Sequence, residues 1–265
     1  YHIVKNPGSY NSQLGVPLSV WQMQSHHELG IFEAGISRPN EMEALQKVIQ
    51  PTLGIFTNIG TAHDEGFSSF EQKIIEKLKL FPNVEKLIYF YDHEFIHKAV
   101  SSTAIPSFSW GKSDGADLQI TTSGNDFKVQ WNNETYVLQL PFRDHASIEN
   151  CLHCVALMVN LGYSLRNVQE RISLLKSIPM RLELKQGINN CQLIDDSYNN
   201  DLGGLRISLD FLVGIQKKKK TIILSDILQS GLEDKELIHK IRDLIGHSDV
   251  TRFIGIGPVL LKNQS

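Results

Sequence analysis

Two apolar runs in the N-terminal part of the sequence end in side chains that could bind a metal ion. Glu33 follows Ile31-Phe32, and His63 follows the run Leu53–Asn58 by way of a glycine turn. A carboxylate oxygen and a neutral imidazole nitrogen can share a divalent cation, and Mg²⁺ would complete its shell with water and phosphate oxygens. If the two runs are neighbouring strands, Glu33 and His63 converge at one end of a sheet. Taken singly, each has another explanation, since a strand-end Glu can cap the next helix and a His can bond to the backbone.

A third polar segment, Asp195-Asp196-Ser197-Tyr198-Asn199-Asn200, follows the apolar pair Leu193-Ile194. Such a loop can hold a ribose hydroxyl through Asp, stack a nucleobase on Tyr and bond the base edge through Asn. The alternative is a cap for the helix expected from Leu202, with Asn199, Asn200 or Asp201 as its capping residue. Capping accounts for one polar side chain of the segment but not for all of them.

The elements that must position these side chains alternate between strand and helix patterns from residue 28 onward. Alternation of this kind indicates βαβ units, and so an α/β fold with a mostly parallel sheet covered by helices. Ligands of such sheets bind beyond the C-terminal ends of the strands. The predicted strands are Glu28–Phe32, Leu53–Asn58 and Lys86–Tyr91, and the predicted helices are Asn40–Ile49, Ser69–Phe81 and His93–Val100.

The pattern changes after residue 105 to a small antiparallel meander, followed by two helices and a second α/β segment. Ile178-Pro179 separates the two parts, because proline cannot continue a helix and favours an extended residue before it. The predicted domains are therefore residues 1–178 and 179–265. The predicted meander strands are Asp117–Thr121, Asp126–Trp131 and Thr135–Leu140, and the two helices that follow them are Ser147–Leu161 and Leu165–Ser177. The predicted strands of the second segment are Arg181–Lys185, Cys191–Asp195, Thr221–Leu224 and Thr251–Ile256. Its predicted helices are Leu202–Val213 and Lys235–Ile245.

Composition limits the classes of function. The chain has 265 residues, 41% of them hydrophobic, and a net charge of -3, which gives no electrostatic footprint for nucleic acid or an anionic membrane surface. We find no apolar run long enough to span a bilayer and no secretion signal, so we expect a cytoplasmic protein without a membrane partner. The odd number of cysteines, three, argues against a disulfide framework, and Cys151-x-x-Cys154 lies in an apolar helix pattern that favours core packing over a zinc site.

Two of the polar segments resemble signatures of the Mur ligase family. Thr57–His63 followed by Glu65-Gly66-Phe67 resembles the family word TNI(G)xAHxExF, and Asp195–Asn199 resembles DDSYNAN. The second word is typical of the branch of the family that adds D-alanyl-D-alanine. Asn11–Pro17 is similar to the NNDIGVP of that branch, and Arg181 matches the arginine that opens the family's C-terminal domain. The resemblance covers nearly the whole chain.

The resemblance implies an ATP-dependent amide ligase of peptidoglycan synthesis. ATP would phosphorylate the carboxylate of UDP-N-acetylmuramoyl-tripeptide, and the amine of D-alanyl-D-alanine would then attack the acyl phosphate. The protein mainly positions the reactants and neutralises developing charge. Residues 1–178 would be the central ATP-binding domain and 179–265 a partial Rossmann-like C-terminal domain. The implied site residues are Glu33 and His63 for Mg²⁺, Asn150 for adenine, Arg181 for the phosphates, and Asp196, Tyr198 and Asn199 for further nucleotide contacts.

Lys77 lies fourteen residues after His63, where the resemblance implies a lysine that CO₂ converts to a carbamate. Lys79 is the local competitor. On the predicted helix, Lys77 falls roughly 80° and Lys79 roughly 120° from the centre of the apolar stripe, so Lys77 is nearer the buried side. Partial burial favours the neutral amine, which alone attacks CO₂. The alternative is a surface lysine whose stem covers apolar atoms.

Two departures from the family pattern affect the expected activity. No G-x-x-G-K-[ST] phosphate loop occurs in the 265 residues, so we expect the chain by itself to bind ATP weakly and to have negligible ligase activity. The family's His-Asn-x-x-Asn retains only Asn150, with His145 one position out of register. The words around Ser147–Asn150 and Leu224–Gly231 resemble ligases fused to an alanine racemase, which would add pyridoxal phosphate only if that domain were present. The alternative is a catalytically inactive ligase-like fragment or an interaction module.

Overall fold

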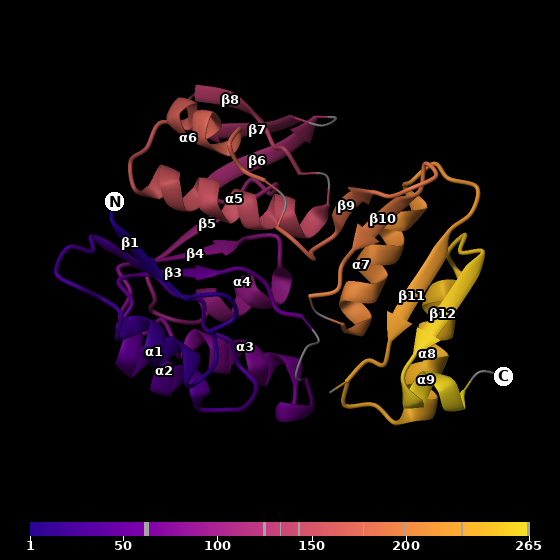
Figure 1. The fold of residues 1–265 in the computed structure, drawn as a ribbon. Coiled ribbons are helices and arrows are strands. Elements are labelled where there is room, and N and C mark those ends of the chain that lie inside the picture. The colour runs from indigo at the N-terminus through magenta and orange to yellow at the C-terminus, as the bar shows by residue number, and fades with distance from the viewer. Residues whose placement is uncertain are drawn as a thin grey trace. The chain divides into compact units, whose positions relative to one another are not determined.

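The computed structural model describes residues 1–60, 64–123, 126–132, 134–142, 144–176, 178–198, 200–228 and 230–263. The chain forms two compact units, shown as ribbons in Figure 1. Unit 1 comprises Tyr1–Ile59 and Gly66–Leu175, and unit 2 comprises Gly60–Glu65 and Lys176–Ser265. Among the helices described, none combines the length and the apolar composition that crossing a bilayer requires.

The main sheet of unit 1 has six strands in the order β3-β4-β5-β6-β7-β8. The first four strands pair in parallel, and the last three form the antiparallel meander, so that both lie in one sheet. This arrangement confirms the predicted α/β class with a mainly parallel sheet. The strands are β3 (Leu53–Phe56), β4 (Lys86–Phe90), β5 (Ser107–Gly111), β6 (Leu118–Ser123), β7 (Asp126–Trp131) and β8 (Glu134–Gln139).

An apolar core lies on each face of this sheet. Leu87 and Ile88, adjacent on β4 and both fully buried, belong to different cores because successive side chains of a strand point to opposite faces. Met42, Leu45 and Ile74 cover the Leu87 face, whereas α5 and α6 cover the other (Figure 1). The helices of unit 1 are α1 (Gly15–Val20), α2 (Glu41–Ile49), α3 (Phe70–Leu78), α4 (Glu94–Ser101), α5 (His145–Asn160) and α6 (Leu165–Ile172).

Side-chain caps fix where the site-bearing helices begin. Ser69 accepts a hydrogen bond from the backbone N–H of Gln72 at the start of α3, and Asp144 accepts one from Ser147 at the start of α5. Such caps satisfy backbone donors that have no partner within the helix. The start of α3 in turn sets the direction in which Lys77 points.

The strand that precedes Glu33 does not join the main sheet in the described residues. β2 (Leu29–Ile31) pairs in parallel with β1 (Ile3–Lys5) in a separate two-stranded sheet. The prediction that the strands of Glu33 and His63 are hydrogen-bonded neighbours is therefore wrong for the strands described. The hydrogen-bonded neighbour described for β2 is instead β1, a three-residue strand missing from the sequence pattern.

Unit 2 contains an antiparallel hairpin and an αβαβα segment. The hairpin joins β9 (Glu183–Gln186) and β10 (Gln192–Asp195) through Asn189 and Asn190, both left-handed as a tight hairpin turn requires. The parallel strands β11 and β12 carry the core residues that pack on the helices. The remaining elements are α7 (Leu202–Val213), β11 (Thr221–Ser225), α8 (Asp234–Gly246), β12 (Arg252–Ile256) and α9 (Pro258–Lys262), and η1 (Asp64–Gly66) is a single 3₁₀ turn.

The change of unit between Leu175 and Lys176 falls close to the boundary at Ile178-Pro179 expected from the sequence.

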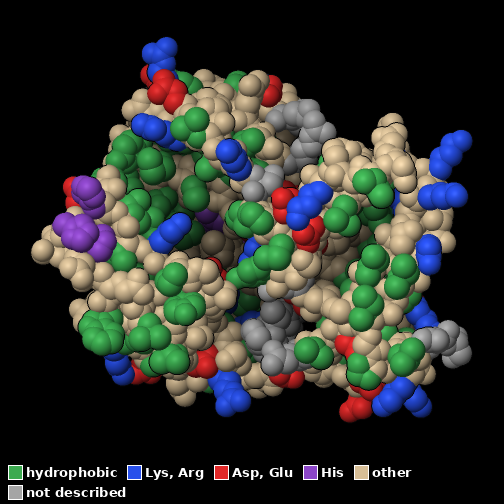
Figure 2. All heavy atoms as spheres, in the orientation of Figure 1, with side chains coloured by type: hydrophobic (Ala, Val, Ile, Leu, Met, Phe, Trp, Pro, Cys, Tyr) green, Lys and Arg blue, Asp and Glu red, His purple; other side chains and the backbone are tan. Residues whose placement is uncertain are grey.

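Figure 2 shows hydrophobic side chains at the surface of unit 2, and Ile223 of β11 and Ile256 of β12 are among its exposed apolar residues. The apolar side chains on the other face of this strand pair, such as Leu224, are buried against α7 and α8. The strand pair is thus covered on one face within the described residues.

Candidate functional site

Glu33, just beyond the end of β2, is oriented by two asparagines from the segment after β1. Asn11 Nδ2 donates to Glu33 Oε1 at 2.8 Å, and the Glu33 backbone N–H donates to Asn6 Oδ1 at 2.7 Å. The backbone N–H of Gly35 donates to the Asn11 carbonyl at 2.7 Å, which fixes Asn11 in turn. The carboxylate is exposed and is held from one side by an amide, as suits a group that offers oxygen to a hard cation.

Of the two candidate lysines, Lys77 is the one directed at the end of β3. Its Nζ donates to the Asn58 carbonyl at 3.3 Å and lies 5.6 Å from the ring centroid of Phe56. Lys79 Nζ instead donates to Glu76 Oε1 at 2.6 Å. Glu76 also accepts from the backbone N–H of Asn40, ahead of α2. Lys79 thus belongs to a contact between helices, and Lys77 belongs to the strand-end region.

The surroundings of Lys77 favour its neutral form. Burial of the side chain, reinforced by the positive charge of Lys73, lowers the pKa of Lys77 to about 8, and the Glu33 carboxylate partly opposes this shift. A substantial fraction of neutral amine is then present near neutral pH. The influence of Glu33 also means that the two predicted site residues affect each other electrostatically.

The loops that follow β2 and β3 meet at Gly66. A Cβ at this position would lie 2.0 Å from the carbonyl oxygen of Ser37, so only glycine fits. Ser37 is itself held by Glu41, whose Oε2 accepts from the Ser37 backbone N–H at 2.6 Å. The segment after Glu33 and the end of the Thr57–Phe67 signature are therefore in direct contact, although their strands are not neighbours.

Replacing Gly66 by alanine is expected to destabilise the protein by about 1–3 kcal/mol, the usual cost of forcing extra atoms into a packed site. The loop of Ser37 would have to move, because a backbone oxygen cannot occupy the position of the new Cβ. The control is Gly60→Ala, where a Cβ would meet nothing within 4 Å. Urea denaturation measures both; equal midpoints for the two variants would show that the Gly66 contact is not tight.

A cavity of about 970 Å³ in unit 1 lies between the sheet and α5. Phe90 and Trp110, at the C-terminal ends of β4 and β5, stack with ring centroids 4.4 Å apart in its wall. Lys112, His145 and Glu149 add polar groups. An aromatic cavity with a few polar groups, placed at the carboxyl ends of parallel strands, suits a planar heterocycle.

Asn150, the predicted adenine contact, is exposed on α5 and does not line this cavity, whereas its neighbours Ile148 and Glu149 do. His145, which we did not carry over from the family pattern, lines it as well. The Gly111-Lys112-Ser113 turn is not a phosphate cradle, because the Lys112 and Ser113 backbone N–H groups already donate to the carboxylate of Asp92.

In unit 2, Arg181 and Tyr198 come together. The Arg181 guanidinium carbon lies 4.3 Å from the ring centroid of Tyr198, and the Tyr198 N–H donates to the Met180 carbonyl at 3.2 Å. Met180 and Leu182, on either side of Arg181, have φ values of 59° and 48°. Two left-handed non-glycine residues are costly in backbone energy, and such strain is common where a side chain must be presented in one direction.

The acidic residues of the same loop are engaged locally. Asp195 accepts from Lys185 Nζ at 2.6 Å, and the Asp196 oxygens accept from the Leu182 N–H at 3.2 Å and from the Ser208 hydroxyl. The helix-capping role falls to Asp201, which accepts from the Gly204 N–H at 2.8 Å. In this structure Asp196 therefore fixes the turn that carries Arg181.

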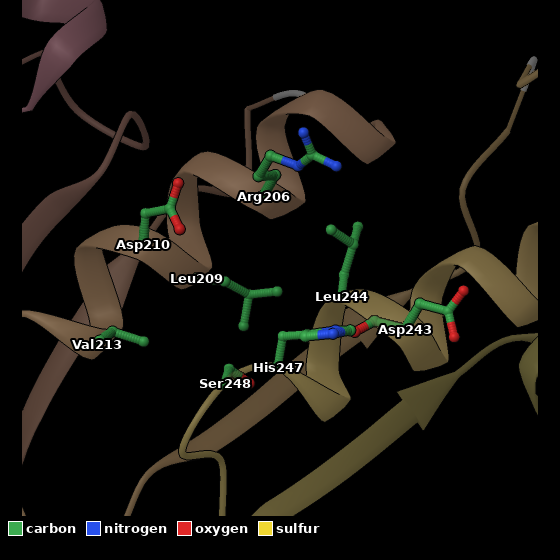
Figure 3. Close-up of a pocket in the computed structure, with 8 residues that line it drawn as sticks. All are labelled: Arg206, Leu209, Asp210, Val213, Asp243, Leu244, His247 and Ser248. Carbon is green, nitrogen blue, oxygen red and sulfur yellow. The ribbon is translucent and has the colours of Figure 1, made fainter.

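A second cavity, of about 320 Å³, lies between α7 and α8 in unit 2. Figure 3 shows the side chains of Leu209 and Leu244 between the two helices, and Arg206 and Asp243 line the cavity as well. None of the residues predicted from the sequence lines the described part of this cavity. It contributes nothing to the site that we infer.

Two predicted site residues, His63 and Asn199, lie outside the described residues. Within the described ranges, no three His, Cys, Asp or Glu side chains form a group that could hold a metal ion. Glu33 is thus the described member of the predicted pair, and the role of His63 stays a prediction.

Comparison with known proteins gives these contacts a context. The sequence model of the Mur ligase middle domain matches residues 1–158. The UDP-N-acetylmuramoyl-tripeptide–D-alanyl-D-alanine ligase of Haemophilus influenzae is 26% identical over 239 residues, which are 88% of this chain and 52% of that protein. The ligase of the same name from Bacillus subtilis is 25% identical over 247 residues, or 91% of this chain and 53% of its own length. The chain spans about half the length of these curated relatives.

Solved structures share the fold. A crystal structure of MurF from Acinetobacter baumannii has a TM-score of 0.81 at 21% identity and covers 98% of this chain and 58% of its own. MurF from Thermotoga maritima in complex with ADP has a TM-score of 0.80 at 19% identity, with 97% of this chain and 64% of its own covered. At these identities the likeness establishes the architecture alone.

Proposed function

Because this chain belongs to the Mur ligase family, we propose that it is part of a cytoplasmic, ATP-dependent amide ligase that joins D-alanyl-D-alanine to UDP-N-acetylmuramoyl-tripeptide. Relatives that it matches over about nine-tenths of its length bear the name of that ligase. Since the chain spans about half of them, the proposal concerns the protein in which these 265 residues work.

The observation that supports the proposal best is the arrangement of Lys77, Asn58 and Glu33. Lys77, whose pKa is lowered, donates to the Asn58 carbonyl at the end of β3. It also interacts electrostatically with the Glu33 carboxylate, which the Asn11 amide orients. The neutral amine of Lys77 would add to CO₂ through a new N–C bond and release one proton, which gives a carbamate. The carbamate and Glu33 would then both present oxygens, the ligands that Mg²⁺ prefers, with His63 as the third candidate.

Mg²⁺ bound there would neutralise charge on the phosphates and on the acyl phosphate. The residues of this chain would hold the reactants in place: Asn11 fixes the Glu33 carboxylate, and the Gly66 contact keeps the two strand-end loops together. Positioning of this kind accounts for much of the rate of phosphoryl transfer.

For the nucleotide, we propose that the aromatic cavity of unit 1 receives the base. Phe90 and Trp110 would supply the stacking surface, and Asn150 lies one residue beyond Glu149 at its edge. Unit 2 carries further candidate nucleotide-binding residues. Arg181 would bind phosphate oxygens, and Tyr198 and Asn199 would contact the nucleoside. Asp196 would act through the turn that presents Arg181.

The test is phosphate release from ATP by the full-length protein that contains this sequence, with Mg²⁺ and both substrates. We expect release to require both UDP-N-acetylmuramoyl-tripeptide and D-alanyl-D-alanine. Lys77→Met should lower kcat by on the order of a hundredfold, the usual loss when a group that stabilises developing charge is removed. Lys79→Met is the matched control and should stay within about twofold, because Lys79 pairs with Glu76.

The 265-residue chain assayed in parallel should release little phosphate, since no G-x-x-G-K-[ST] sequence occurs in it. Substrate-independent release, or none at all from the full-length protein, would favour the alternative of a non-catalytic ligase-like module. Loss of activity in the Lys79 variant rather than the Lys77 variant would show that the wrong lysine carries the proposal.

A further inference from the structure

His153 of α5 is a fully buried polar residue that joins two distant parts of unit 1. Its side chain is 1% exposed, and both ring nitrogens have hydrogen-bonding partners. The Trp110 indole Nε1 lies 2.9 Å from His153 Nδ1, and His153 Nε2 lies 2.8 Å from the Thr57 carbonyl oxygen. The partners are a strand residue of β5 and the residue that follows β3.

The chemistry of the partners fixes the tautomer of His153. An indole N–H can only donate and a carbonyl oxygen can only accept, so Nδ1 must be the acceptor and Nε2 must carry the proton. Burial lowers the pKa of His153 to about 4, so the ring stays neutral near pH 7. Glu149, whose Oε1 lies 3.9 Å from Nε2, is on the side that carries the proton.

Each partner of His153 adjoins one of the two candidate sites. Thr57 precedes Asn58, and consecutive carbonyls at the end of β3 are therefore held by His153 and by Lys77. Trp110 forms part of the cavity wall with Phe90. One imidazole thus bridges the strand end at which Lys77 is held and the aromatic surface of the cavity.

We propose that His153 is a positioning residue, which holds the end of β3 in a fixed relation to the Trp110 wall of the cavity. The inference rests on the proposed function in one respect, namely that the cavity receives a nucleotide base. The link itself requires no ligand. Loss of the imidazole should loosen the backbone that binds Lys77 and should also release the indole of Trp110.

The experiment separates the two hydrogen bonds by substitution in the 265-residue chain. His153→Leu removes both, His153→Gln keeps a donor at the reach of Nε2, and His153→Asn keeps an acceptor at the position of Nδ1. Hydrogen–deuterium exchange of a peptide covering residues 53–59 reports on the end of β3, and the ¹⁵N-indole NMR signal of Trp110 reports on the cavity wall. Val155→Ala is the control, because Val155 is equally buried on α5 but has no hydrogen-bonding side chain.

We expect His153→Leu to speed exchange at residues 53–59 by about fivefold over Val155→Ala, the factor that one ordinary hydrogen bond represents. His153→Gln should restore slow exchange but leave the indole signal shifted, and His153→Asn should do the reverse. Equal behaviour of the Gln and Asn variants, or exchange in His153→Leu that matches the control, would overturn the proposal.

Titration of the full-length protein that contains this sequence with Mg-ADP tests the nucleotide role separately, because the 265-residue chain by itself is expected to bind nucleotide weakly. Binding of Mg-ADP to the wild-type protein should shift the indole signal of Trp110, and the His153→Leu variant should bind Mg-ADP about fivefold more weakly. If Mg-ADP binds without affecting Trp110, or does not bind, the proposed use of the cavity fails. The ligand-free exchange experiment then still decides whether His153 holds the strand end.

Discussion

The acetylation rate of Lys77 is expected to reach half of its maximum near pH 8, the value to which burial and the charge of Lys73 lower its pKa. An ordinary lysine reaches that point near pH 10.4. At pH 7.5 the neutral fraction of Lys77 would then exceed that of an ordinary lysine by about two orders of magnitude. Competitive labelling with acetic anhydride, followed by mass spectrometry of the peptide that contains Lys77, gives the profile. The pH at which the acetylation rate is half of its maximum does not depend on how accessible the amine is. It therefore measures the pKa of Lys77 better than an acetylation rate at one pH does.

The unfolded chain in urea supplies the control for Lys77, because the same side chain then titrates as an ordinary lysine. The pKa of Lys77 is lower in the folded state than in the unfolded state, so the unfolded state binds more protons between pH 8 and 10.5. The contribution of Lys77 to the free energy of unfolding therefore rises as the pH rises through that window. Lys73→Met should move the midpoint upward by removing a like charge. Coincident profiles in the folded and unfolded chain would contradict the argument.

Acidification should reduce the free energy of unfolding by about 3 kcal/mol through His153 alone. The unfolded imidazole takes up a proton near pH 6.5, whereas the folded one does so only near pH 4, so the unfolded state binds more protons throughout this interval. Stability therefore falls as pH falls from 6.5 to 4. The expected size follows from about 1.4 kcal/mol per pKa unit.

Urea denaturation of wild type and His153→Gln at pH 7, 5.5 and 4.5 measures this contribution. Glutamine does not titrate, so the difference between the two curves should shrink as the pH is lowered. Burial raises the pKa of Glu149, which is present in both proteins, and its effect largely cancels in the difference. Curves that stay parallel from pH 7 to 4.5 would mean that His153 can be protonated in the folded state at little cost.

Most helices and most strands could be predicted from the sequence because their periodicity is local, whereas the short helix α1 was not expected. The order of the strands could not, because hydrogen bonding between β1 and β2 joins residues more than twenty positions apart. Strand β5 was also missed, since Phe108, Ser109 and Trp110 are all buried and leave no alternation to detect.

The same distinction applies to the site. The family resemblance placed the lysine at position 77, and the angular position on one helix put Lys77 nearer the buried side than Lys79; the side chain of Lys77 does point to the end of β3. The amide that orients Glu33 and the link through His153 depend on contacts that spacing does not reveal. The resemblance implied Asp196 as a nucleotide contact, and spacing did not reveal that its oxygens accept hydrogen bonds from the Leu182 N–H and the Ser208 hydroxyl. A fused alanine racemase stays a prediction from short words of sequence.

Position 66 has a consequence for how this gene can change over time. Every single amino-acid substitution there adds at least a Cβ, which would fall 2.0 Å from the Ser37 oxygen. No compensating replacement of the Ser37 side chain can help, because the obstructing atom is backbone and is present whatever residue occupies position 37. Change to any other amino acid at this position therefore carries a cost in stability, and relief requires a shift of one of the two loops. Such a change would also shift the neighbouring segment that begins at Glu33, so lineages that keep the activity should keep both loop lengths.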